Sequence, residues 1–109
     1  MKIAIIGSTG LIPRMYEHKA EMEAKGHIVT LPLFDKDSDD ELHLTRVNKT
    51  RIMESDQVHL IWDGRSPGTI LDIGIVIGLG QALKIIYLES MSIPGIVKKY
   101  AELFENEID

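Results

Sequence analysis

The sequence has no cysteine, few aromatic residues and no long apolar run. Without cysteine, the chain has no disulfide framework, no thiolate nucleophile and no sulfur ligand for a metal. Each apolar run is shorter than the roughly 18 residues of a membrane-spanning helix, and the first residues enter a strand-like pattern without the layout of a signal peptide. We therefore predict a cytoplasmic protein with no membrane partner.

Positive charge is also scarce. The chain has 12 lysines and arginines against 17 aspartates and glutamates, and its net charge of −5 argues against a nucleic-acid partner. The four histidines, His18, His27, His43 and His59, stand singly in the sequence and lack the spacing of a metal site. We expect no metal and no cofactor. A small anionic ligand remains compatible with this charge, because a helix N-terminus binds an anion locally.

Strand and helix patterns alternate along the chain, which is long enough for one core and one domain over residues 1–109. The patterns predict strands at residues 3–6, 27–33, 58–62 and 85–88. They predict helices at residues 11–25, 41–54, 68–82 and 94–105, with an acidic turn at 35–40. This alternation predicts an α/β fold, a doubly wound, flavodoxin-like or Rossmann-like parallel sheet of four to five strands with helices on both faces. We expect the strand order 2-1-3-4.

Two loops follow neighbouring strands of this predicted sheet, at the edge where such folds bind ligands. The first, residues 7–14, reads G-x-x-G and has Pro13 where a dinucleotide fingerprint needs glycine, so we do not favour a dinucleotide. Its glycines serve either only a turn with positive φ or a ligand loop. In a ligand loop, Ser8 and Thr9 would bind a sugar or phosphate and Arg14 a phosphate.

The second loop, residues 63–69, also has two interpretations, together with the start of the helix that follows it. As a structural element, Ser66 and Pro67 are the N-cap and first residue of a helix, and Thr69 with Asp72 fits a capping box. The helix is apolar nearly all round and is therefore predicted to be buried, with Gly74 and Gly78 allowing close packing. As a site, Asp63 and Asp72 would share a crevice, where paired carboxylates suit chemistry at a sugar. Trp62 is either a core residue or a platform for a base.

Several motifs together resemble the nucleoside 2-deoxyribosyltransferase-like superfamily, which includes the 2′-deoxynucleoside 5′-monophosphate N-glycosidases. They are the Gly7-Ser8 loop, KGHIVTLP, ESDQVHLIWDG, S-x-G-T-x-x-D-x-G and ALKIIYL, and they cover nearly the whole chain. The resemblance implies cleavage of an N-glycosidic bond, with Asp72 at the position of the attacking glutamate. It also implies that Ser66 contacts a 5′-phosphate, as in the N-glycosidases, and that the protein is a homodimer or higher homo-oligomer. Asn48 stands in place of a family aspartate, and Ala4 in place of a tyrosine.

These observations define a predicted site for a small-molecule nucleoside or nucleotide. The predicted catalytic residues are Asp72 and Asn48. The predicted substrate-binding residues are Gly7, Ser8, Thr9, Arg14, Asp63, Gly64, Ser66, Gly68 and Thr69. Two functions remain open: an N-glycosidase or deoxyribosyltransferase, and a catalytically inactive nucleotide-binding or sensing module of the same fold.

Overall fold

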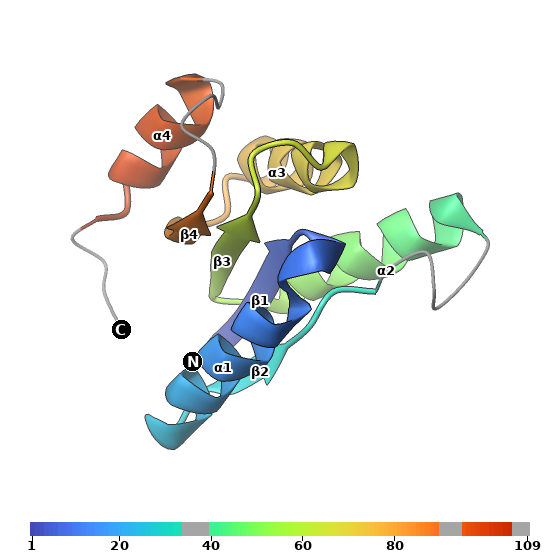
Figure 1. The fold of residues 1–109 in the computed structure, drawn as a ribbon. Coiled ribbons are helices and arrows are strands. Elements are labelled where there is room, and N and C mark those ends of the chain that lie inside the picture. Colours follow the sequence, from blue (N-terminus) through green and yellow to red (C-terminus); the bar gives the residue numbers. More distant parts are fainter. Residues whose placement is uncertain (34–39, 90–94, 106–109) are drawn as a thin grey trace.

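Four parallel strands form one sheet in the order β2-β1-β3-β4 (Figure 1). The computed structural model describes residues 1–33, 40–89 and 95–105. The strands are β1 (Lys2–Gly7), β2 (Ile28–Thr30), β3 (Gln57–Trp62) and β4 (Leu83–Leu88). The predicted strand order and the α/β class are confirmed. β1 and β3 form the centre of the sheet, and all six residues of β3 are buried.

Helices cover both faces of the sheet, and each face has its own apolar core (Figure 1). The elements are the short 3₁₀ helix η1 (Thr9–Leu11), α1 (Ile12–Ala24), α2 (Glu41–Glu54), α3 (Pro67–Leu79) and α4 (Gly95–Glu102). Met15 and Met22 of α1 pack on one face, against Ile3, Ile5 and Ile61. On the other face, α2, α3 and α4 contribute Ile52, Ile73, Val76, Val97 and Ala101 to a core with Ala4, Ile6, Val58, Leu60 and Trp62. The alternation along β1 and β3 therefore supplies both cores.

Glycines at two helix ends determine where α1 and α3 stop. Gly26 has a φ of 93°, and the N–H groups of Gly26 and His27 donate to the carbonyls of Glu23 and Met22, which is a Schellman motif. Gly80 ends α3 with a φ of 67°.

The second strand is shorter than predicted, since only Ile28–Thr30 pair with β1. Pro94, the predicted start of the last helix, and most of the acidic turn lie outside the described residues.

The prediction that α3 is buried all round is wrong. The helix turns Thr69, Asp72, Ile73 and Val76 inward, whereas Ile70, Leu71 and Leu79 are 49%, 54% and 43% exposed. Among the described residues its glycines do not serve close packing either, because no atom beyond the adjacent helix backbone lies within 4 Å of a Cβ built on Gly74 or Gly78. Apolar composition alone therefore overstated how much of this helix the fold covers. Within the described residues, no helix is long and apolar enough to cross a membrane.

Candidate functional site

A cavity of about 480 Å³ opens at the carboxyl ends of β1 and β2, between α2 and the N-terminus of α3. It is lined by Gly7, Ser8, Thr9, Pro32, Leu33, Glu41, Leu44, Thr45, Asn48, Ser66, Pro67, Gly68, Thr69, Leu71 and Asp72. The predicted catalytic residues and most predicted binding residues thus line one cavity. Of the predicted site residues, Arg14, Asp63 and Gly64 are not among those that line it.

Gly7 and Ser8 join the first loop to β3. A Cβ on Gly7 would lie 1.8 Å from the carbonyl oxygen of Ile61, so a side chain has no room there. The φ of Gly7 is not positive, and the positive-φ explanation of this glycine is therefore wrong. The Ser8 N–H donates to Ile61 O at 3.1 Å, and its buried hydroxyl accepts from the Asp63 N–H at 2.9 Å. Close approach of two strands, rather than turn conformation, requires glycine at position 7.

The side chain of Asp63 organises its own loop instead of facing the cavity. Its carboxylate accepts hydrogen bonds from Arg65 N and Ser66 N, both at 2.8 Å, and from Ser66 Oγ at 2.9 Å. Desolvation raises the pKa of Asp63, but these hydrogen bonds, with a contribution from Ser8, outweigh it and lower the pKa to about 2. Gly64 takes the left-handed conformation that the turn needs, with a φ of 80°. Asp63 and Gly64 therefore shape the loop that presents Ser66.

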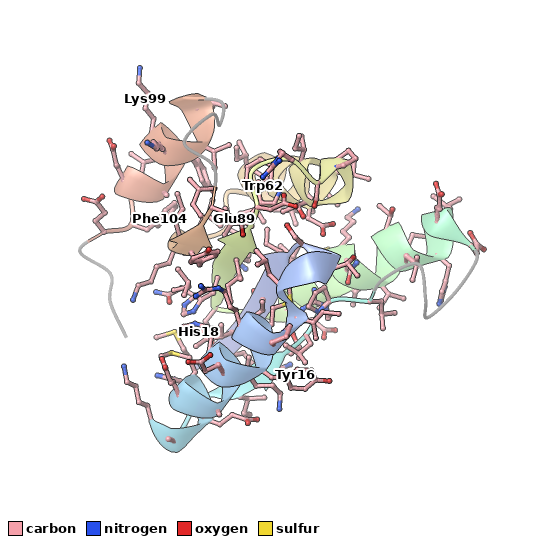
Figure 2. All side chains as sticks on the ribbon, viewed as in Figure 1. Tyr16, His18, Trp62, Glu89, Lys99 and Phe104 are labelled. Atoms are coloured by element: carbon pink, nitrogen blue, oxygen red, sulfur yellow. The ribbon has the colours of Figure 1, made fainter. Side chains whose placement is uncertain are left out.

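Arg14 and Trp62 are also occupied elsewhere. The Arg14 guanidinium lies 3.8 Å from the centre of the Tyr87 ring, in a cation–π contact. Trp62 is fully buried beside α3 (Figure 2), and its Nε1 donates to Ser66 O at 3.2 Å. Trp62 is thus a core residue, and no aromatic side chain of the described residues lines the cavity. Ala4, which the sequence resemblance aligns with a tyrosine, is likewise buried in the apolar core.

The N-terminus of α3 reaches the cavity without a side-chain cap. Ser66 occupies the N-cap position and Pro67 the first helical position, as predicted. The capping box is wrong, because Asp72 is the sixth helical residue and the Ser66 hydroxyl donates to Asp63 instead. Thr69 is only 3% exposed, lines the cavity, and its hydroxyl makes no hydrogen bond within the described part of the chain. The N–H groups of the first turn therefore lack a side-chain acceptor beside an unpaired hydroxyl.

Asp72 is a buried carboxylate on the cavity wall. Its side chain faces inward from α3 with 9% exposure, and no group among the described residues donates a hydrogen bond to it. Desolvation raises its pKa from 3.8 to about 6, against the lowering effect of the nearby Arg51 charge. A carboxyl group with a pKa near neutrality in a cavity can serve as a nucleophile or as a general acid or base.

Arg51 does not line the cavity, but its charge acts on Asp72 and its Nε donates to Asn48, two residues that do. The sequence pattern did not single it out. Its side chain is largely buried, and desolvation lowers its pKa to about 10, while the charge of Asp72 acts in the opposite direction. Arg51 follows Asn48 by three residues in α2, so both side chains share one face of the helix. The three-residue spacing from Asn48 was the sequence signal that could have identified Arg51. It was missed because arginines on a polar helix usually face solvent.

Asn48 fixes the segment after β2. Its Oδ1 accepts from Leu33 N at 3.1 Å and from Arg51 Nε at 3.2 Å, while its Nδ2 donates to Leu33 O at 3.2 Å. An amide side chain has only two N–H donors, so a single N–H of Asn48 remains for a ligand. The structure thus places Asn48 on the cavity wall, with most of its hydrogen bonds made to the protein.

Two histidines that are isolated in sequence meet on the opposite face of the sheet. His18 Nε2 and His59 Nδ1 lie 2.7 Å apart, and His59 Nε2 lies 2.8 Å from Gln57 Oε1. His59 thereby bridges His18 and Gln57 through its two ring nitrogens. The described residues contain no group of three or more metal-ligating side chains. This histidine pair is a buried hydrogen-bond chain of the core.

Comparison with known proteins adds no further assignment, since no protein family, curated protein or solved structure matches this chain.

Proposed function

We propose that the cavity binds a nucleoside or a nucleoside 5′-monophosphate, and that Asp72 attacks the N-glycosidic bond in a hydrolysis or deoxyribosyl-transfer reaction. The observation that carries this proposal is Asp72 itself, a buried carboxylate on the wall of a cavity of about 480 Å³, to which no group of the described residues donates a hydrogen bond. A cavity of this size falls within the range of small-molecule sites. The proposal also treats the chain as a relative of the nucleoside 2-deoxyribosyltransferase-like superfamily, on the sequence motifs alone.

The cavity wall offers different surfaces for the parts of such a ligand. The N-terminus of α3, with Gly68 and Thr69, supplies N–H and hydroxyl donors for a phosphate. Ser66 lines the same end of the cavity, but its N–H and hydroxyl both donate to Asp63. Leu33 and Leu44 form an apolar wall that suits the face of a base. In this arrangement the sugar lies between them, beside Asp72. The uncapped helix end and the unpaired Thr69 hydroxyl together favour a monophosphate over a free nucleoside.

The proposed reaction uses the ionised form of Asp72. Its carboxylate oxygen forms a bond to the anomeric carbon while the bond from that carbon to the base nitrogen breaks, and the base leaves with the electron pair and takes up a proton from water. Water then attacks the anomeric carbon of the glycosyl ester, or an acceptor base does so, and the Asp72 carboxylate is released. The buried position of Asp72 favours this chemistry because a poorly solvated carboxylate is more reactive.

A second candidate function is a nucleotide-binding or sensing module without turnover. The engaged amide of Asn48 favours it, because Asn48 replaces an acidic residue of the family and is mostly committed to Leu33 and Arg51. Aspartate at position 72 is also one methylene shorter than the family glutamate. Both candidates use the same cavity, and they differ in whether a base is released.

The proposal includes a homodimer or a higher homo-oligomer in the cytoplasm. Support for self-association comes from α3, whose outward face carries Ile70, Leu79 and open glycines but no charge. An exposed apolar face of this kind favours a protein partner. The compartment is a proposal from the sequence.

The purified protein should be incubated with a panel of deoxynucleosides and their 5′-monophosphates, with free base measured by chromatography. The enzyme proposal predicts release that is abolished in Asp72→Ala, whereas Asp72→Glu retains or increases it. The binding-module proposal predicts thermal stabilisation by a nucleotide without base release, since a ligand of the native state raises its stability. If neither release nor stabilisation occurs with any ligand of the panel, both proposals are wrong.

A further inference from the structure

Arg51 connects α2 with the ends of two strands beneath the cavity. Its Nη2 donates to Ile5 O at 3.0 Å, and its Nη1 lies 3.0 Å from Thr30 Oγ1 and 3.3 Å from Thr30 O. Its Nε donates to Asn48 Oδ1 at 3.2 Å. One side chain thus joins β1, β2 and α2.

All these acceptors are neutral, so they hold the guanidinium without cancelling its charge. Within the described residues, no carboxylate makes a salt bridge with Arg51, and the charge that acts on it is that of Asp72. A guanidinium has five N–H donors, and four contacts to the protein leave it little freedom to turn toward solvent. Arg51 therefore supplies a fixed positive charge to a carboxylate that otherwise lacks a polar partner.

We propose that Arg51 is the positioning residue of this site, which keeps Asp72 ionised inside the cavity and fixes Asn48 and the ends of β1 and β2 around it. A contribution of Arg51 to catalysis rests on the proposed function. The electrostatic coupling between Arg51 and Asp72 does not depend on that function. Glu41 is the other titratable side chain that lines the cavity, and it is exposed on the first turn of α2. The pKa of Asp72 is set instead by desolvation, which raises it, and by the Arg51 charge, which lowers it.

The direct test is the titration of the Asp72 carboxyl carbon by carbon-13 NMR in the wild type, in Arg51→Met and in Arg46→Met. Arg46 is an exposed arginine of the same helix and is the matched control. We expect the midpoint of Asp72 to rise by about 1 unit or more in Arg51→Met, because an opposite charge nearby shifts a carboxyl pKa by roughly that amount. The midpoint should stay unchanged in Arg46→Met. An equal midpoint in the wild type and Arg51→Met would overturn the proposal.

The wild-type protein gives a second measurement, which decides the question if Arg51→Met does not fold. The Arg51 Nε–H resonance should shift with pH at the midpoint of Asp72, and this step should be absent in Asp72→Asn. A resonance that stays constant while Asp72 titrates contradicts the coupling. If base release is found, its acidic limb should move upward in Arg51→Met by the same interval as the Asp72 midpoint. If no substrate is found, the proposed function fails while both NMR measurements still decide the role of Arg51.

Discussion

Asp63 and Asp72 are two aspartates whose surroundings move their pKa values in opposite directions. Asp63 accepts hydrogen bonds from two backbone N–H groups and one hydroxyl, and its pKa falls to about 2. Asp72 is desolvated and has no donor among the described residues, so its pKa rises to about 6 despite Arg51. Two carboxyl groups whose pKa values differ in this way take different roles at neutral pH. Asp63 stabilises the loop, and Asp72 is the group available for chemistry.

The first prediction at the residue scale concerns the pH dependence of base release. If Asp72 acts as the nucleophile, only its ionised form is active, so kcat/KM should rise with pH through a midpoint near 6, the pKa of Asp72. The measurement is the rate of base release between pH 4 and pH 8 at low substrate concentration. Activity that falls as the pH rises through 6 would instead identify Asp72 as a general acid.

The second prediction concerns stability. In the unfolded chain Asp72 titrates near 3.8, and in the folded protein near 6, so folding takes up a proton between these values. The contribution of the Asp72 carboxyl to the free energy of unfolding is therefore fully present below about pH 4. It is lost as the pH rises through 6, which lowers the free energy of unfolding by up to about 3 kcal/mol. Asp72→Asn removes the titrating group. Urea unfolding should show that the stability of Asp72→Asn relative to the wild type increases between pH 4 and pH 7. A constant difference would contradict the raised pKa.

At the scale of elements, the sequence pattern was sufficient for the layout and insufficient for the polar contacts. The alternation of strand and helix patterns predicted parallel strands, and the order β2-β1-β3-β4 is the common one for such a fold. The continuous apolar runs agree with the burial of β1 and β3 on both faces. Ser66 was correctly placed at the N-cap of α3, but the partner of its hydroxyl, Asp63, depends on the turn at Gly64. Helix spacing likewise cannot reveal that Arg51 finds carbonyl acceptors at two strand ends, because those acceptors come from distant parts of the chain.

The junction between β1 and the first loop gives the third prediction. Gly7→Ala places a methyl group against the carbonyl oxygen of Ile61, and the strands must separate to admit it. We expect a loss of about 3 kcal/mol or more in the free energy of unfolding, since forced overpacking costs roughly that much. Gly10→Ala is the matched control, because no atom lies within 4 Å of the added Cβ. It should change stability by less than about 0.5 kcal/mol. Equal effects in urea unfolding would show that β1 and β3 are not in such close contact.

At the scale of the whole molecule, charge and apolar surface are distributed unevenly. The chain has a net charge of −5, and two copies repel each other over most of their surfaces. The outward face of α3 is free of charged residues, since its only polar side chains, Thr69 and Asp72, point inward. Copies that meet through this face bury apolar side chains without opposing their acidic groups. An isologous dimer through α3 is the arrangement that this distribution favours.

The fourth prediction tests that arrangement. Ile70→Glu and Gly74→Glu each place a carboxylate on the outward face of α3, where Ile70 is 49% exposed and Gly74 borders open space. Neither change touches the core, so both variants should fold. We expect both variants to sediment as monomers and the wild type to sediment as a dimer. Ile96→Glu is the control, because Ile96 is 61% exposed and belongs to another helix, α4. Sedimentation velocity at several protein concentrations measures the outcome. A monomeric wild type, or dimers in the α3 variants, would exclude α3 as the interface, and the uncharged face would then need another partner.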